Sequence, residues 1–188
     1  MNFFKEAPTL IGTKVTLRNI NPDLDNQVFY KIFQEPDMHL WTRNKIPANE
    51  NETYRILCQY RDFENIIAWS VIRNGSDDFI GTYWIAPINN GDKKIATEAQ
   101  RIGKKYWRKG FTKEARKLVY DFAFFQLGIT EIHAGAWKDN TNSCKSMENI
   151  GFVLLKAERK LFEKREEELI ENHYFLTKQI WMRQRTYL

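Results

Sequence analysis

Apolar and polar residues alternate along several short segments of the chain, and this two-residue period is typical of half-buried β-strands. The first segment, residues 14–20, reads KVTLRNI. Residues 66–73 and 79–88 form a pair, and the Asn74-Gly75 dipeptide between them is a strong signal for a hairpin turn. The same reasoning predicts four further strands, over residues 95–103, 129–137, 152–162 and 172–181.

A longer apolar period, of three to four residues, predicts helices. The helical segments are residues 21–35, 50–63, 112–128 and 140–151. In the first segment the apolar residues of one face are Leu24, Val28, Phe29 and Ile32. Asn21 suits the N-cap position and Pro22 the first helical position, so we expect this helix to begin at Pro22.

The helix over residues 112–128 has the clearest apolar stripe. The stripe consists of Leu118, Phe122 and Phe125, together with Ala115. Glycine readily adopts the left-handed conformation that follows many helix ends, so Gly128 predicts the end of this helix.

The predicted elements follow the order β-α-α-β-β-β-α-β-α-β-β, with no internal repeat and no linker rich in glycine, serine or proline. A chain of 188 residues with 43% hydrophobic and 28% charged residues is long and apolar enough to bury a core. We therefore predict one α/β (α+β) domain over residues 1–188, built on a central mixed sheet.

The sequence offers little sign of a membrane segment, export or a structural metal. The longest apolar runs, such as residues 118–125, are too short to span a bilayer, and the start of the chain does not resemble a secretory signal. Cys58 and Cys144 are too few for a disulfide framework, and no Cys/His spacing resembles a zinc site. The expectation is a cytoplasmic protein that uses no metal and does not enter a membrane.

Positive charge is concentrated in residues 101–117, RIGKKYWRKGFTKEARK. This segment has eight basic residues and one acidic residue, whereas the whole chain has 29 basic and 24 acidic ones, so the remainder is slightly acidic. The segment could be a solvated face, a nucleic-acid patch with interleaved Tyr106, Trp107 and Phe111, or a pocket for one phosphorylated ligand. The acidic remainder disfavours nucleic acid, because a long polyanion needs an extended basic surface.

The position of the basic segment favours the pocket. It lies between a predicted strand that ends near Gly103 and a predicted helix that begins near Thr112. A helix N-terminus offers unpaired N–H groups and the positive end of the helix dipole, which together favour a pyrophosphate. Gly110 lets the backbone approach phosphates closely, and Arg108 and Lys109 add positive charge.

Residues 102–152 resemble the acetyl-CoA-binding core of the GNAT N-acetyltransferases, in particular the branch of the ribosomal-protein N-terminal alanine and serine acetyltransferases. The matching features occur in the family's order: the turn YWRKGF, the pair Glu114-Ala115, the step Asn140-Thr141-Asn142-Ser143 and the closing Gly151-Phe152. LIGTKVTLRNINPDLD and NHYFLTKQIW resemble the family's first and last elements, so the resemblance covers nearly the whole chain. It implies a GNAT-type fold, with a central mixed, mostly antiparallel sheet, helices on both faces and a cofactor-binding core over about residues 95–152.

The resemblance also implies acetyl-CoA as cosubstrate and assigns residues to it. The backbone of Ile102 and Gly103 would contact the pantetheine arm. The pyrophosphate cradle would comprise Arg108, Lys109, Gly110, Phe111 and Thr112. Asn140 would hold the pantetheine or thiol end, and Lys145 would reach the polar portions of the cofactor.

Three positions depart from the pattern of this branch. Arg108 stands where the branch usually has glycine, and Thr112 where it has alanine or glycine. Arg108 can present its N–H provided that the turn does not require a positive φ. An ungapped match also places Thr97 where many relatives have a glutamate.

Acetylation of an amine requires removal of an amine proton and a proton for the departing thiolate. Glu98 is the nearest acidic candidate for a base acting through water; the alternative is an exposed strand glutamate, and strand alternation decides between the two faces. Ser143 is a candidate proton donor or hydrogen-bond partner of the sulfur, or else a residue that satisfies the local helix amides. His133 and Cys144 are expected to be buried structural residues.

The acceptor site is expected where the loop of residues 36–51, the strand that bears Trp84 and residues 163–171 meet. Trp41 and His39 are candidates to line it. Residues 163–171, EKREEELIE, could attract a cationic amine through their acidic side chains, or could be a solvated turn.

These features predict an acetyl-CoA-dependent N-acetyltransferase that transfers acetyl directly to the primary amine of a protein N-terminus or a small molecule. The protein is expected to act as a monomer or homodimer. One alternative is a GNAT-like module that binds acyl-CoA with little catalysis, which the departures at Thr97 and in the cradle motivate. A nucleic-acid-binding module is the second alternative.

Overall fold

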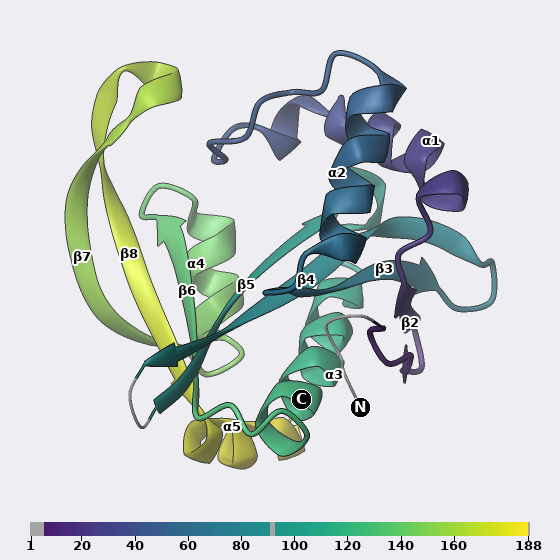
Figure 1. Ribbon diagram of the computed structural model, residues 1–188. Helices are drawn as coiled ribbons and strands as arrows, with labels where there is room; N and C mark the ends of the chain where they lie inside the picture. Colours follow the sequence, from purple (N-terminus) through teal and green to yellow (C-terminus); the bar gives the residue numbers. More distant parts are fainter. Residues whose placement is uncertain (1–5, 91–92, 188) are drawn as a thin grey trace.

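The computed structural model describes residues 6–90 and 93–187 of the chain. Within these ranges the strands form one eight-stranded sheet in the order β1-β2-β3-β4-β5-β6-β8-β7 (Figure 1). Neighbouring strands are antiparallel except β5 and β6, which are parallel. The strands are β1 Leu10–Ile11, β2 Val15–Asn19, β3 Ile67–Arg73, β4 Asp78–Asn90, β5 Lys93–Ile102, β6 Glu131–Trp137, β7 Val153–Phe162 and β8 Glu167–Thr177. The mixed, mostly antiparallel sheet predicted from the sequence is confirmed.

Helices cover both faces of this sheet, as predicted (Figure 1). They are α1 Pro22–Phe33, α2 Glu50–Asp62, α3 Phe111–Phe125, α4 Thr141–Glu148 and α5 Lys178–Gln184. Because neighbouring strand residues point to opposite faces, Ala68 packs with α1 and α2 whereas Trp69 packs on Phe122 of α3. We call these two sides the α1 face and the α3 face. No helix in the described part of the chain is long and apolar enough to cross a membrane.

Helix α1 begins at Pro22, and the side chain of Asn21 accepts hydrogen bonds from the N–H groups of Asp23 and Leu24, so the predicted start is confirmed. The predicted apolar face is wrong at one position. Leu24 is 70% exposed, and Asp25 is fully buried instead. Arg18 forms an ion pair with Asp25 at 2.5 Å, and this counter-charge lets a carboxylate occupy the buried face.

The end of the chain also differs from the prediction. Strand β8 stops at Thr177, whose hydroxyl caps α5 by accepting the N–H of Ile180 at 3.2 Å. Trp181 is fully buried, and its indole N–H donates to Asp121 of α3 at 2.8 Å. The predicted strand over residues 172–181 is too long because apolar residues there suit a strand or a helix, and only packing against α3 selects the helix.

Candidate active site

Strands β5 and β6 pair at only three positions before they diverge. The pairs are Ile95 with Glu131, Ala96 with Ile132 and Thr97 with His133. Beyond them, residues 98–102 of β5 and 134–137 of β6 no longer pair with each other, and Figure 1 shows the two strands separating. We call this region the splay. On its other edge β5 stays paired with β4 as far as Ile102.

The backbone of β5 leaves polar groups directed into the splay. The N–H of Gly103 donates to the carbonyl of Ile80 on β4 at 3.0 Å. Because hydrogen-bonded and non-bonded pairs alternate in an antiparallel ladder, Gln100 and Ile102 direct their backbone groups away from β4. The Ile102 carbonyl accepts from the indole N–H of Trp107 at 2.6 Å, which leaves its N–H and both backbone groups of Gln100 at the open edge.

The backbone groups of Gly103, unlike those of Gln100, are both hydrogen-bonded within the protein. Its N–H is bonded to Ile80, and its carbonyl accepts the N–H of Tyr106 at 2.9 Å. A Cβ atom at this position would lie 3.2 Å from Ile32 of α1. This geometry argues against a backbone contact between Gly103 and a ligand. It favours the backbone of Gln100 for such a contact instead.

The turn that follows β5 contains two left-handed residues. Gly110 has φ +84° and Arg108 has φ +59°. The turn therefore requires a positive φ at Arg108. The condition on which Arg108 could replace glycine without strain is not met. A non-glycine residue in this region costs about 1–2 kcal/mol, so Arg108 occupies its position under strain.

The start of α3 exposes unpaired backbone donors. Gly110 is the N-cap and provides no side-chain cap. The N–H groups of Phe111, Thr112 and Lys113 have no acceptor among the described residues, whereas the N–H of Glu114 bonds to the carbonyl of Gly110. Such a helix start attracts an anion through its free donors and the positive end of its dipole.

Glu114 attaches this helix start to the beginning of β2. Its carboxylate accepts hydrogen bonds from the N–H groups of Thr13, Lys14 and Val15 and from the Thr13 hydroxyl, at 2.6–3.1 Å. Burial alone would raise the pKa of Glu114, but these hydrogen bonds hold it below the ordinary value of 4.5. The Lys14 ammonium, which donates to the Lys109 carbonyl at 3.3 Å, is thereby placed beside the turn.

Two of the three aromatic residues of the basic segment are not free to stack on bases. Tyr106 is 5% exposed and Phe111 9% exposed, and both belong to the core on the α3 face. Trp107 is 37% exposed, and its indole N–H donates to the carbonyl of Ile102. The segment therefore does not present the row of exposed aromatic residues that the nucleic-acid alternative needs.

Glu98 points to the α3 face, where it is enclosed. Its side chain is 3% exposed and lies 3.3 Å from the guanidinium of Arg116, which donates to the hydroxyl of Ser146 on α4 at 2.9 Å. Burial raises the pKa of Glu98, and the positive charge of Arg116 opposes this shift. The alternative of an exposed strand glutamate is therefore wrong for Glu98. Arg116, although it belongs to the basic segment, is buried in this pair.

The opposite face carries Thr97 and His133, the last pair before the splay. His133 is half-buried, and its Nε2 atom lies 3.0 Å from the carboxylate of Glu131. The expectation of a buried structural histidine is therefore wrong. The sequence shows only a histidine in an apolar strand, so the parallel pairing with β5 is what reveals its position.

Asn140 and Ser143 lie at the start of α4. The side-chain oxygen of Asn140 caps the helix by accepting the N–H of Ser143 at 3.3 Å. Within the described part of the chain, the Asn140 amide NH₂ and the Ser143 hydroxyl have no hydrogen-bond partner. Asn140, and not Ser143, thus satisfies the local amides, and the roles predicted for Asn140, Ser143 and the exposed Lys145 toward a cofactor stay predictions.

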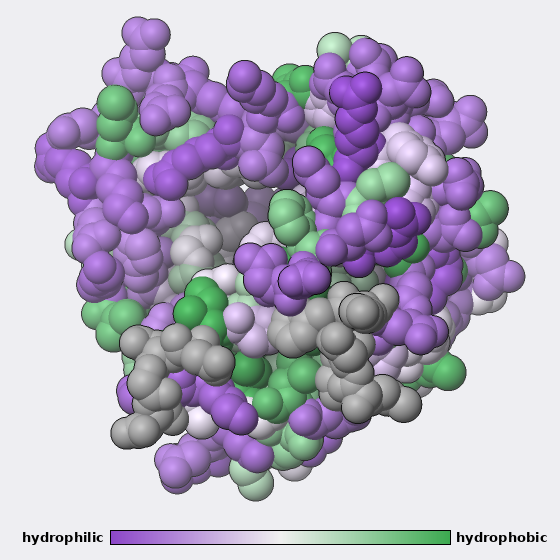
Figure 2. All heavy atoms as spheres, in the orientation of Figure 1, coloured by the Kyte–Doolittle hydropathy of each residue, from purple (hydrophilic) through white to green (hydrophobic). Residues whose placement is uncertain are grey.

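The loop after α1 and the tip of the β7–β8 hairpin lie against each other, as expected for the acceptor site. The Lys164 ammonium donates to the carbonyl of Asn44 at 2.5 Å, and Arg165 donates to that of Leu40 at 3.2 Å. The Arg165 guanidinium also stacks over Trp41, 4.5 Å from the ring centre. Figure 2 shows a hollow in the surface between this loop and the hairpin.

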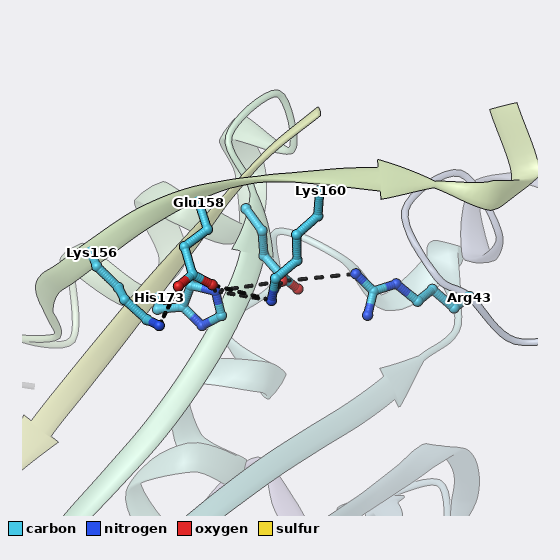
Figure 3. Close-up of polar contacts among 6 residues, drawn as sticks. Arg43, Lys156, Glu158, Lys160 and His173 are labelled. Atoms are coloured by element: carbon cyan, nitrogen blue, oxygen red, sulfur yellow. Dashed lines mark hydrogen bonds and ion pairs between the residues drawn. The ribbon is translucent and has the colours of Figure 1, made fainter. Parts of the chain in front are cut away.

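The side chains of the hairpin tip that contact the loop are basic. Lys164 and Arg165 contact the loop. The acidic Glu171 is neutralised, because Lys160 lies 2.6 Å, His173 3.5 Å and Arg43 3.8 Å from its carboxylate (Figure 3). The other glutamates of the tip, Glu163, Glu166, Glu167 and Glu168, are exposed, so an acidic attraction for a cationic amine stays a prediction.

His39 and Trp84 are on the α1 face. His39 is 8% exposed, and its Nε2 atom contacts the carbonyl of Phe33 at the end of α1. Trp84 is partly buried against the core formed by α1 and α2. The roles predicted for both residues in lining the acceptor site stay predictions.

A separate cavity of about 450 Å³ lies at the junction of β2 and α1. Its lining includes Arg18, Asn21, Asp23 and Arg61, and it contains none of the predicted site residues. Among the described residues, no group of three or more His, Cys, Asp or Glu side chains is arranged to hold a metal ion.

Comparison with known proteins gives a consistent result. The family model described as "Acetyltransferase (GNAT) domain" matches residues 14–153. "Uncharacterized N-acetyltransferase p20" from Bacillus licheniformis is 26% identical over 150 residues, which cover 77% of this chain and 82% of that protein. A GCN5-related N-acetyltransferase from Brucella melitensis has a TM-score of 0.84 at 17% identity, covering 96% of this chain and 83% of its own. Mycobacterium smegmatis RimJ, solved in complex with CoA-disulfide, has a TM-score of 0.78 at 15% identity, covering 96% and 94%.

Proposed function

The chain belongs to the GNAT acetyltransferase family, and from this premise we propose that it transfers acetyl directly from acetyl-CoA to a primary amine, without an acyl-enzyme. The family membership shows an N-acetyltransferase in general terms. The site residues and the class of amine are the subject of the proposal.

The observation that best supports this proposal is that the splay and the unpartnered N–H groups at the start of α3 follow one another along the chain. The open backbone edge of Gln100 and Ile102 is followed, within one short turn, by the unpartnered N–H groups of Phe111, Thr112 and Lys113. An extended chain can hydrogen-bond to the strand edge while an attached pyrophosphate binds the helix start. This sequence of donors matches a CoA-type ligand.

The residues present fit this ligand. Gly110 leaves the backbone bare at the turn, and Lys109 and Lys113 are exposed cations beside it. The amide NH₂ of Asn140 and the hydroxyl of Ser143, both without a partner in the described residues, would hold the thiol end. Acetyl-CoA, when bound, supplies an acetyl thioester as electrophile and a thiolate as leaving group.

His133 is the group that we propose takes the amine proton. It lies on the open α1 face at the start of the splay, with Glu131 as hydrogen-bond partner, whereas Glu98 is enclosed on the α3 face in its pair with Arg116. As the amine nitrogen bonds to the acyl carbon and the C–S bond breaks, His133 accepts the amine proton and the Ser143 hydroxyl donates a hydrogen bond to the sulfur. Sequence resemblance to the ribosomal-protein branch supports a peptide N-terminus as one acceptor; a small-molecule amine is the other.

The test is a thiol-release assay with acetyl-CoA and a panel of N-terminal peptides, free amino acids and aminoglycosides. Release that depends on an amine supports the proposal. Tight acetyl-CoA binding without release for any amine would instead support the alternative of an acyl-CoA-binding module. Location in the cytoplasm, a single domain with its cofactor core over residues 95–152, and a monomeric or homodimeric state remain predictions.

A matched pair of glycine variants tests the cofactor site. Gly110→Asp places a side chain and a negative charge beside the free amides, so acetyl-CoA binding should fall at least about a hundredfold while the protein remains folded. Gly75→Asp makes the same change at another left-handed glycine, in the β3–β4 turn where the added Cβ meets open space, and should bind normally. Normal binding by Gly110→Asp would refute the cradle.

A further inference from the structure

Arg101 is a partly buried cation that has no counter-charge among the described residues. It projects from β5 onto the α1 face, with its guanidinium carbon 4.1 Å from the centre of the Phe33 ring. No carboxylate pairs with it among the described residues, and its Nη1 atom is buried without a hydrogen-bond partner. Burial lowers the pKa of Arg101, and its neighbour Tyr60 of α2 opposes this only in part.

Two further basic side chains converge on Arg101. His39 packs on the same Phe33 ring, with ring centres 5.9 Å apart, and its Nδ1 atom is buried without a partner in the described residues. Lys164 is exposed at the hairpin tip and donates to the carbonyl of Asn44. Burial lowers the pKa of His39, the hydrogen bond to the Phe33 carbonyl opposes this shift, and the positive charge of Arg101 adds to it. The neutral ring is therefore favoured, and the positive charge of the group comes from Arg101 and Lys164. Burial and then the positive charge of Arg101 lower the pKa of Lys164. We call these three residues the Arg101 cluster.

Other cations around the hollow are compensated, which sets the cluster apart. Lys160 and Arg43 contact Glu171 (Figure 3), and Arg165 lies 3.3 Å from Glu167. A buried cation with neither a counter-charge nor a full set of acceptors is costly. Among the described residues Arg101 has both deficits, and a single anionic group beside it would remove them.

The cluster lies on the same face as the proposed reaction centre. Arg101 is four residues beyond Thr97 on β5, and residues with this even separation would share a face in a regular strand. The rise of about 3.3 Å per residue places their Cα atoms about 13 Å apart. A ligand with its amine near Thr97 and His133 and an anionic group several bonds away would reach Arg101.

Resting on the proposed function, we propose that the Arg101 cluster binds an anionic group of the acceptor, so that the preferred substrates are primary amines that carry a carboxylate or a phosphate. Short acidic peptides have this chemistry and length. Polyamines and aminoglycosides bring further positive charge against Arg101 and Lys164 and are poor acceptors.

The experiment compares acceptors that differ only in charge: peptides with an N-terminal serine followed by two glutamates, two glutamines or two lysines. A fourth peptide, with phosphoserine in place of the glutamates, separates phosphate from carboxylate recognition. The acidic peptides should exceed the glutamine peptide in kcat/KM by about tenfold, the usual worth of a charge-assisted hydrogen bond. In Arg101→Gln this ratio should fall to about one through KM, with kcat little changed.

Two variants keep the test decisive. Lys164→Gln, at the hairpin tip, should reduce the same ratio if Arg101→Gln fails to fold. Arg159→Gln removes an equal charge from the outer side of β7, where Arg159 is 72% exposed and pairs with Glu168, and should leave the ratio unchanged. Equal rates for acidic and glutamine peptides in the wild type, a preference for the lysine peptide, or an unchanged ratio in both cluster variants would overturn the inference.

A binding measurement separates this inference from the proposed function. In the presence of CoA, an N-acetylated acidic peptide should raise the melting temperature of the wild-type protein but not that of Arg101→Gln or Lys164→Gln. If no amine is acetylated and this shift is still seen, the proposed function fails and the anion site stands. If amines are acetylated without regard to charge and the shift is missing, only the anion site fails.

Discussion

The proposed cofactor cradle and the proposed acceptor region are built in different ways. The cradle is made of backbone groups from one continuous segment, residues 100–113, and Glu114 secures it to β2. The acceptor region joins side chains from three distant parts of the chain: the loop with His39, strand β5 with Arg101, and the hairpin tip with Lys164.

This difference explains which charges are visible in the sequence. The eight basic residues of the segment 101–117 drew attention to a phosphate site, yet two of them have other roles. Arg116 is buried in an ion pair with Glu98, and Arg101 faces the opposite side of the sheet. A run of like charge therefore identifies a region, but strand and helix periodicity distribute its members between both faces.

The contrast predicts that changes on the α3 face act first on stability and cofactor binding, whereas changes on the α1 face act on acceptor turnover. The largest effect should come from Arg116→Met, which leaves Glu98 buried without its partner. We expect a loss of about 3–5 kcal/mol in the free energy of unfolding, measured by urea denaturation. Adding Glu98→Gln to Arg116→Met should recover much of this loss of stability. If the double variant were as unstable as Arg116→Met alone, the ion pair between Arg116 and Glu98 would be contradicted.

His133→Gln should act in the opposite manner, on catalysis with little loss of stability. Removing a general base typically costs about a hundredfold or more in kcat, and acetyl-CoA binding should be unaffected. The measurement is the pH dependence of kcat/KM, from which the rise due to the catalytic base should disappear in the variant. If the pH profile of kcat/KM kept its rise in His133→Gln and lost it in Glu98→Gln, the general base would be Glu98 and not His133.

Glu114→Gln should weaken both stability and acetyl-CoA binding, because the charged hydrogen bonds to Thr13, Lys14 and Val15 hold the helix start. We expect about 1–3 kcal/mol at neutral pH. Since the pKa of Glu114 is lowered on folding, this contribution is complete above the ordinary value of 4.5 and is lost as the pH falls through the lower, folded-state pKa. Unfolding curves of wild type and variant should converge in that acidic range; a constant difference would contradict the assignment.

The smallest effect should come from Arg108→Gly, which relieves the left-handed strain in the cradle. The variant should gain up to about 1 kcal/mol of stability, since the cost of the left-handed conformation is partly offset by the greater freedom of glycine in the unfolded chain. Acetyl-CoA affinity should be kept, because the turn would use the backbone N–H. A fall in affinity would show that the Arg108 side chain itself contacts the cofactor.

Much of the fold could be predicted because its signals are local. The cap at Asn21, the hairpin at Asn74-Gly75 and the left-handed Gly128 after α3 each depend on a few neighbouring residues, and all three occur in the structure. The errors arise where packing decides between equivalent patterns. Leu24 and Asp25 exchanged faces because Arg18 supplied a counter-charge, and α5 formed because Trp181 found a site on α3.

The candidate site also has parts that local sequence signals predict and parts that depend on packing. The sequence by itself determined the family and most of the order of elements, and it sufficed to propose the cradle, because backbone donors at a strand end and a helix start follow from contiguous residues. Only the tertiary structure decided that Glu98 is enclosed beside Arg116, that His133 lies at the splay and that Arg101, His39 and Lys164 converge. The reason is that one residue of strand register reverses the face of a side chain, and contacts between distant segments exist only once the sheet is assembled.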